Sequence, residues 1–237
     1  MGASQVKGST DTMKTKFSGR DMSYRIIKAG ESFSFPDQHA FVDNGQDDGS
    51  SLVFIGTQVK QTYRENTNKP QECAFVLLEL GAECLGVHIG DAAGPTNVLG
   101  FARFRLGKAP PTNLVELVRK PWTDPAALEA AKSALEEAGL VVAVCQDFPG
   151  RILNRLLRPY YNAALRRLDE GLATASDMDA TLRMGLGYPE GPIELLDRTG
   201  LEHHFEVTQA LFEQLGQEPY CPARRARTAW LRAHDGD

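Results

Sequence analysis

The chain has 237 residues, and its 26 Lys and Arg residues against 31 Asp and Glu residues give a formal net charge of −5 at pH 7. This length suits one large domain or two modest ones. The negative charge argues against nucleic acid or an anionic membrane as the main partner. No apolar run approaches the roughly 18 residues of a membrane span, and the polar N-terminus lacks a signal-peptide core. We therefore expect a cytoplasmic protein that binds neither nucleic acid nor membrane.

The residues that usually hold metals do not cluster in the sequence. The four cysteines form no C-x-x-C pair and have no metal-ligand spacing, so reduced thiols are expected (Cys73, Cys84, Cys145 and Cys221). His203 and His204 are neighbours on an expected helix and cannot face one ligand. We predict no metal site.

The first part of the chain has the pattern of a sheet. Residues 1–21 are polar and are expected to form a flexible leader. Short apolar runs bounded by turn formers then predict strands at 24–30, 51–57, 74–80, 98–104, 113–119 and 140–144. The pattern leaves open whether residues 31–50 form a helix, a loop or a binding segment.

The last two strands enclose the clearest unit of this half. Between them lies DPAALEAAKSALEEAG, in which Asp124 can cap a helix, Pro125 suits its first position and Gly139 suits its exit. Strand, helix and strand in this order predict a parallel crossover. We expect an α/β domain at 22–147 with a predominantly parallel sheet.

From residue 148 onward the strand pattern stops. Helices are predicted at 151–170, 176–185, 192–197 and 201–215. Ser176 and Asp179 resemble a capping start of the second helix, and residues 222–234 are expected to form a basic surface helix that docks on the body. An all-helical domain is therefore predicted at 148–237.

The helical part resembles a known family over about 75 residues. The matching stretches are DFPGRILNRLLRPYYNAALRRLDEG (147–171), DMDATLRMGLGYPEGPIELLDRTGL (177–201), and the run through EQLG (213–216) to PYCP (219–222). Their order, spacing and residue types are similar to those of the C-terminal domain of 3-hydroxyacyl-CoA dehydrogenases. The resemblance implies a Rossmann-like N-terminal domain, NAD as the cofactor, an acyl-CoA substrate and a homodimer formed by the helical domain.

Two site residues follow from the resemblance. Asn154 matches the Asn of the P-G-x-x-x-N-R-L helix, which lies beside the thioester in the family, and Glu116 matches the Glu that orients a catalytic His. Such a carboxylate fixes the tautomer of the imidazole, and an amide can hold a reacting oxygen. Two structural alternatives remain open. In one, Asn154 only bonds to its neighbours, and in the other Glu116 faces solvent from an edge strand.

Two features of the family are missing from the sequence. No G-x-G-x-x-G follows the first strand, and without those glycines side chains keep the backbone away from a diphosphate. The position of the catalytic His corresponds to Phe104 or Ala102, depending on the direction of counting, and neither can move a proton. The dinucleotide site and the base are therefore expected to be absent.

Two functions are compatible with this pattern. The chain could belong to an active dehydrogenase that oxidises a 3-hydroxyacyl-CoA with NAD and takes its cofactor site from elsewhere. Alternatively it is a catalytically silent relative that binds an acyl-CoA-type molecule or serves dimerisation or regulation. The residue chemistry favours the second function. His88, which lies near a strand end, could be imagined as a displaced base, but a structural role is expected.

Overall fold

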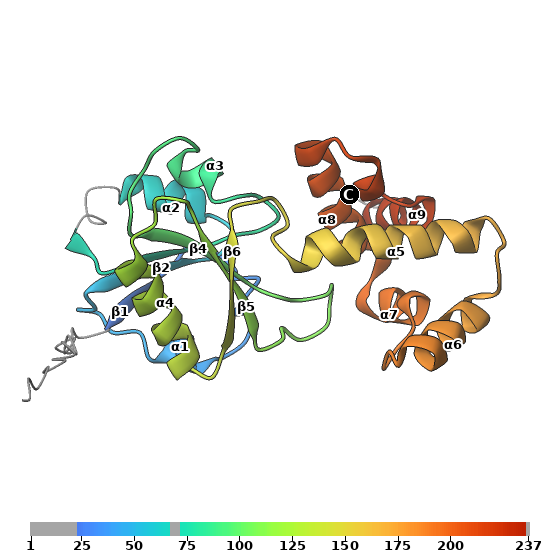
Figure 1. Ribbon diagram of the computed structural model, residues 1–237, viewed down its shortest axis with the longest axis horizontal. Helices are drawn as coiled ribbons and strands as arrows, with labels where there is room; N and C mark the ends of the chain where they lie inside the picture. Colours follow the sequence, from blue (N-terminus) through green and yellow to red (C-terminus); the bar gives the residue numbers. More distant parts are fainter. Residues whose placement is uncertain (1–22, 67–71, 236–237) are drawn as a thin grey trace, which may run out of the picture.

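The structure, a computed structural model, describes residues 23–66 and 72–235. The expected leader at 1–21 lies outside the described residues. The chain forms two halves that lie side by side, a sheet with its covering helices and a group of helices (Figure 1). No helix among the described residues is long and apolar enough to cross a membrane.

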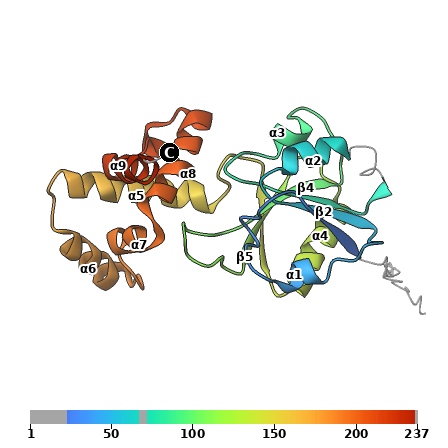
Figure 2. The same cartoon turned by 180° about the vertical axis from the view of Figure 1, so that it is seen from behind.

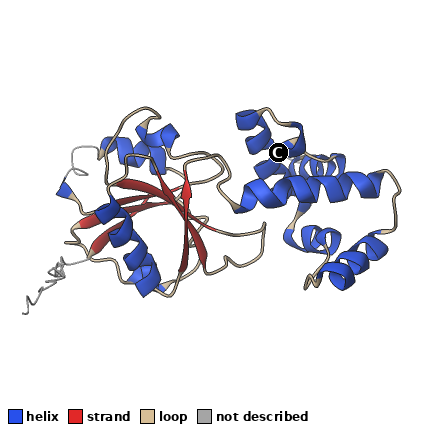
Figure 3. Cartoon of the chain, in the orientation of Figure 1, coloured by secondary structure: helices blue, strands red, loops and turns tan. Residues whose placement is uncertain are grey.

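The first half is built on a six-stranded sheet whose order follows the sequence from β1 to β6. Its strands are β1 (Tyr24–Lys28), β2 (Ser51–Ile55), β3 (Val76–Glu79), β4 (Val98–Arg103), β5 (Leu114–Arg119) and β6 (Val141–Gln146). Neighbouring strands are parallel except β4 and β5, which are antiparallel. The predicted strands and the predominantly parallel sheet are confirmed (Figure 3).

Helices cover both faces of the sheet, as the apolar strands require. On one face α1 (Ala40–Asp43) and α4 (Pro125–Glu137) enclose a core with side chains from every second strand position. On the other face lie α2 (Val59–Glu65) and α3 (Gly86–Ile89) (Figure 2). Since β1, β2 and β3 are parallel neighbours but α1 and α2 cover opposite faces, the β1–β2 and β2–β3 connections have opposite hands.

Helix α4 begins and ends as the sequence predicts. The Asp124 side chain accepts a hydrogen bond from the Ala126 amide at 2.9 Å, and Pro125 occupies the first turn. Gly139 has a φ of 82°, the left-handed conformation that lets the chain turn back into β6. Strands β5 and β6 are parallel, so the predicted crossover is confirmed.

The second half consists of helices packed around one apolar cluster. They are α5 (Leu153–Asp169), α6 (Ala175–Leu186), α7 (Pro192–Thr199), α8 (Leu201–Leu215) and α9 (Arg224–His234), with a short 3₁₀ turn at Glu218–Tyr220. The predicted basic tail helix is α9. It docks on the body by placing the Trp230 ring 5.1 Å from that of Phe205.

The predicted capping start of α6 is wrong by two residues. The cap is Thr174, whose hydroxyl accepts from the Asp177 amide at 3.2 Å and donates to the Asp177 carboxylate at 2.7 Å. Asp179 instead accepts from the Ile193 and Glu194 amides at 2.9 and 3.0 Å. It therefore joins α6 to the first turn of α7.

The turn between β4 and β5 reaches into the helical half. Leu106 belongs to the apolar cluster of that half. The Lys108 amide donates to the Thr199 carbonyl at 2.9 Å, and the Lys108 ammonium lies 2.8 Å from Glu202. This hairpin tip is a contact between the halves that is separate from the 147–152 connection.

Candidate functional site

Glu116 lies where the sheet meets the first turn of α5. Its side chain is 1% exposed because β5 runs between β4 and β6, so the alternative that it faces solvent is wrong. One carboxylate oxygen accepts from the Ile152 and Leu153 amides at 2.8 Å each. A helix start carries unpaired amides and a partial positive charge, and both favour a carboxylate there.

The second oxygen of Glu116 is paired with Arg151. The Arg151 Nε lies 3.2 Å from Glu116 Oε2, and Arg151 Nη2 donates to the Gly81 carbonyl at 2.8 Å. Arg151 has a φ of 51°, and it is the one non-glycine residue with a positive φ in the described part of the chain. Sequence reasoning missed this residue, although an Arg directly after a Pro-Gly corner was a signal.

The position across the sheet from Glu116 contains no base. In the antiparallel pairing of β4 with β5, Ala102 stands opposite Glu116. The buried carboxylate thus faces a methyl group on the neighbouring strand and the guanidinium of Arg151 in the turn before α5. Arginine keeps its proton throughout the physiological pH range, so the guanidinium cannot replace the imidazole of the family as a base.

Asn154 is the second residue of α5 and faces the helical half. Its side-chain oxygen accepts from Arg158 Nε at 2.9 Å. Arg158 is 2% exposed and also contacts the His204 Nδ1 at 3.0 Å, while His204 Nε2 lies 3.0 Å from Asn162 Oδ1. Glu116 and Asn154 are brought together through Arg151 and the first turn of α5, but they share no hydrogen bond partner among those described.

Burial lowers the pKa of two basic side chains in this network, those of Arg158 and His204. Burial lowers the pKa of the Arg158 guanidinium to about 10. Burial, and then the charge of Arg158, lower the pKa of His204 well below its usual value. His204 is therefore neutral at physiological pH and serves as a hydrogen-bonding group inside the helical half.

The remaining histidines do not supply a base beside Glu116. The imidazole of His88, in α3, lies 3.3 Å from the Glu83 carboxylate in the loop after β3. His203 points outward and pairs with Glu206 at 3.2 Å, while its neighbour His204 is buried. As expected from their adjacency, the two do not face one ligand. In the described ranges no group of three or more possible metal ligands occurs.

The turns after β1 and β2 do not fit a dinucleotide. Dinucleotide crevices in open parallel sheets form where the strand order reverses, and the order here runs from β1 to β6 without reversal. Gly30 and Gly56 have positive φ, but a Cβ at either would meet the opposite turn, at Thr57 Oγ1 (2.6 Å) or the Ala29 carbonyl (2.5 Å). Because Gly30 and Gly56 have no side chains, the two turns can pack on each other.

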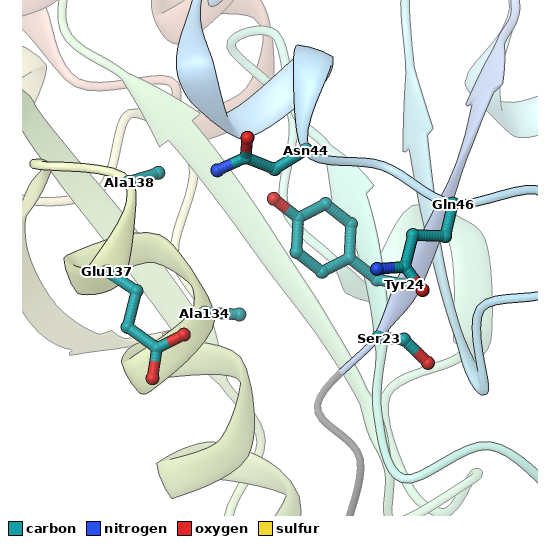
Figure 4. Close-up of a pocket in the computed structure, with 7 residues that line it drawn as sticks. All are labelled: Ser23, Tyr24, Asn44, Gln46, Ala134, Glu137 and Ala138. Carbon is teal, nitrogen blue, oxygen red and sulfur yellow. The ribbon is translucent and has the colours of Figure 1, made fainter.

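A pocket of about 250 Å³ lies away from Glu116, beside the beginning of β1 (Figure 4). It is lined by Ser23, Tyr24, Asn44, Gln46, Ala134, Glu137 and Ala138. The Tyr24 hydroxyl donates to the Phe41 carbonyl at 2.8 Å and is thus already paired. Burial and the nearby Glu137 raise the pKa of Tyr24 to about 12, so the Tyr24 hydroxyl keeps its proton near neutral pH.

The helical half matches a known protein family. Residues 150–233 match the family described as 3-hydroxyacyl-CoA dehydrogenase, C-terminal domain. A 3-hydroxybutyryl-CoA dehydrogenase of Bradyrhizobium diazoefficiens is 38% identical over 130 residues, which are 53% of this chain and 44% of that protein. A 3-hydroxyadipyl-CoA dehydrogenase of Escherichia coli is 38% identical over 128 residues, 54% of this chain and 26% of that protein. The chain thus spans less than half the length of these relatives.

Solved structures extend the likeness to the sheet. The crystal structure of FadB2 from M. tuberculosis superposes with a TM-score of 0.62 at 25% identity and covers 76% of this chain and 65% of that one. For the 3-hydroxybutyryl-CoA dehydrogenase from Escherichia coli the TM-score is 0.67 at 24% identity, with coverage of 84% and 42%. The expected Rossmann-like domain followed by a helical domain is confirmed.

Proposed function

The chain belongs to the 3-hydroxyacyl-CoA dehydrogenase family through its helical half, and from this premise we propose that it is a catalytically silent member that binds an acyl-CoA-type thioester. The proposal depends mainly on one observation, the pairing of Glu116 with Arg151 at 3.2 Å while Ala102 stands opposite. The family reaction removes a hydride from C3 of a hydroxyacyl thioester while a base takes the hydroxyl proton. Loss of a general base typically lowers the rate about 10²- to 10⁴-fold.

The cofactor side of the reaction supports the same proposal. NAD would supply the hydride acceptor, but the turns after β1 and β2 do not fit it. The strand order has no reversal, and Gly30 and Gly56 are used for contacts between the two turns. We therefore infer that the chain by itself does not oxidise a hydroxyacyl-CoA.

The junction of the halves retains groups that suit a ligand with carbonyl or phosphate oxygens. The Nη1 atoms of Arg151 and Arg155 are buried and have no hydrogen bond partner in the structure. A buried donor without an acceptor costs roughly 1–3 kcal/mol, and more when it is charged. These two guanidinium groups flank Asn154 along the chain, at the position where the family resemblance expects the thioester. An oxygen-rich ligand would satisfy them.

Calorimetric titration of the purified chain with acetoacetyl-CoA and, separately, with NADH tests the proposal. We expect binding of the thioester and no binding of NADH. Micromolar binding of NADH would contradict the inference that the chain has no dinucleotide site. Absence of thioester binding would contradict the proposal that it binds an acyl-CoA-type molecule. Asn154→Ala should weaken thioester binding without unfolding the protein. Gln214→Ala, an exposed amide that bonds within its own helix, is the matched control.

An active dehydrogenase remains the second candidate because Glu116 and Asn154 are both present in the chain. It would require an unconventional dinucleotide site and base within the chain, or a partner subunit that supplies them. Oxidation of 3-hydroxybutyryl-CoA by the chain alone, measured as NADH absorbance, would favour this candidate over the silent one. We expect no activity above background.

We further propose that the protein is a homodimer through its helical half and resides in the cytoplasm. Three apolar side chains close to the start of α5, Phe148, Ile152 and Leu156, are 56%, 38% and 67% exposed, which supports a covered surface there. Size exclusion should give about twice the 26.0 kDa subunit mass. Leu156→Lys should shift it toward one subunit, whereas Val87→Lys in the other half should not. The four cysteines, all in the described ranges, form no disulfide, which agrees with a reducing compartment.

A further inference from the structure

Glu79, the last residue of β3, carries a carboxylate that is 6% exposed at the end of the sheet where a dinucleotide would bind. The amides of Ser34 and Gly56 both donate to it at 2.6 Å, one to each oxygen. The Ser32 hydroxyl adds a third hydrogen bond at 3.0 Å. The turns after β1 and β2 thus converge on a single buried anion.

The donors around Glu79 are neutral. No Lys, Arg or His among the described residues forms an ion pair with this carboxylate. Main-chain amides and a hydroxyl in loop turns are the groups with which parallel sheets hold the phosphates of bound nucleotides. In this protein a group of donors of the same type binds one of the chain's own side chains, the Glu79 carboxylate.

The surrounding contacts hold the cradle closed. The Ser34 hydroxyl accepts from the Arg103 amide at 3.2 Å, which attaches the segment after β1 to the end of β4. The Ser32 hydroxyl also accepts from the Phe35 amide at 2.9 Å, so it is fixed in its orientation toward Glu79. A ligand phosphate would have to displace a carboxylate that its own strand holds in place.

We infer that Glu79 is the resident anion of this edge and the residue that excludes dinucleotide phosphates from it. Removal of its carboxylate should leave a cradle that accepts a small carboxylate ion from solution. This inference concerns only the end of the sheet at which β1, β2 and β3 terminate. Its test is therefore independent of thioester binding at Glu116 and Asn154.

The test is thermal unfolding of wild type and of Glu79→Ala, with and without sodium acetate, which replaces the deleted carboxylate. Glu79→Ala should melt about 5–15 °C lower, because one buried and two half-buried donors lose their acceptor. Acetate at about ten times its Kd should raise the melting temperature of the variant by about 4 °C and leave wild type unchanged. Sodium chloride at the same ionic strength is the salt control.

Two matched variants separate a filled cradle from a general salt effect. Glu79→Gln keeps the side-chain volume and should melt lower without responding to acetate. Glu83→Ala removes a half-buried carboxylate from the following loop and should also show no response. Stabilisation of wild type by 1 mM NADH, or a folded Glu79→Ala that ignores acetate, would overturn the inference.

Hydrogen exchange on the wild-type protein tests the inference without any variant. The Ser34 and Gly56 amides lie outside the strands, but their hydrogen bonds to the buried carboxylate should protect them from exchange by at least about 100-fold. Exchange of both amides at the rate of an open loop would show that Glu79 does not hold them.

Discussion

Arg151 and Glu116 form a buried ion pair that connects the helical half to β5, the strand next to the edge of the sheet. The side chains are 5% and 2% exposed, and two amides and one carbonyl make further hydrogen bonds with them, whereas Arg151 Nη1 has no partner among the described residues. An ion pair of this kind does not simply add stability, because both charges lose their water. Removal of either side chain would leave the charge of the other buried without a counter-ion.

Arg151→Met should therefore destabilise the protein by about 3–5 kcal/mol, because it leaves the Glu116 carboxylate buried without its cation. Urea unfolding followed by circular dichroism measures this loss. Arg167→Met is the control, since Arg167 pairs with Glu170 on the surface and such a pair contributes less than about 1 kcal/mol. Equal losses for the two variants would contradict the role of Arg151.

His204 should make the protein sensitive to acid. Its pKa is lowered by burial in the folded state, so below the unfolded value near 6.5 the unfolded chain binds the proton more readily. Stability should then fall as the pH falls, by about 1.4 kcal/mol from this residue between pH 7.5 and 5.5.

The measurement compares the free energies of unfolding at these two pH values for wild type, His204→Gln and His203→Gln. The loss due to His204 should disappear in the first variant. It should persist in the second, because His203 is exposed and lies outside the buried network. If all three proteins lose the same free energy, the prediction is wrong.

Gly107 should be sensitive to any added side chain because it touches the helical half. Its φ is 51°, and a Cβ there would lie 2.0 Å from the Thr199 carbonyl oxygen. Gly171 also has a positive φ, of 75°, but it has no atom within 4 Å of such a Cβ. Gly171→Ala should cost about 1–2 kcal/mol from backbone strain alone.

Gly107→Ala should cost at least about 1 kcal/mol more than Gly171→Ala, because overpacking adds to the strain. Denaturant unfolding of both variants gives the comparison. Equal costs would mean that the hairpin tip is not seated on the helical half in solution.

Cys145 should react slowly with alkylating reagents in the folded protein. Burial, and then the charge of Glu116, raise the pKa of its thiol to about 11. At pH 8 this leaves about 100-fold less thiolate than an ordinary thiol would have. Iodoacetamide labelling followed by mass spectrometry should show slow modification of Cys145 in buffer and fast modification in urea. Equal rates would contradict the raised pKa.

The sequence predicted those elements whose signals are local. Asp124, Pro125 and Gly139 lie within the helix that they delimit, and each occupies its expected position around α4. The cap of α6 shows the limit of this approach. Thr174 and Ser176 both precede a suitable Asp by three residues, and Asp179 was needed elsewhere, at the start of α7.

The site depended on contacts between residues far apart in the chain. Glu116 was identified by resemblance, but its partner Arg151 lies 35 residues later and adopts a backbone conformation that a non-glycine residue rarely takes. Glu79 carried a signal that was not used, a charged residue inside the apolar run AFVLLEL. Two of its three donors, Ser32 and Ser34, come from the segment at 31–50, for which the sequence pattern left the structure open.

The hairpin tip at Leu106–Lys108 gives the two halves a second point of attachment besides residues 147–152. Two attachment points define an axis. If both attachments are kept, the halves can only rotate relative to each other about the line that joins the two points. They cannot separate. Cleavage of the chain at residue 148 would then leave the pieces associated, whereas loss of the hairpin contact would free the helices to reorient.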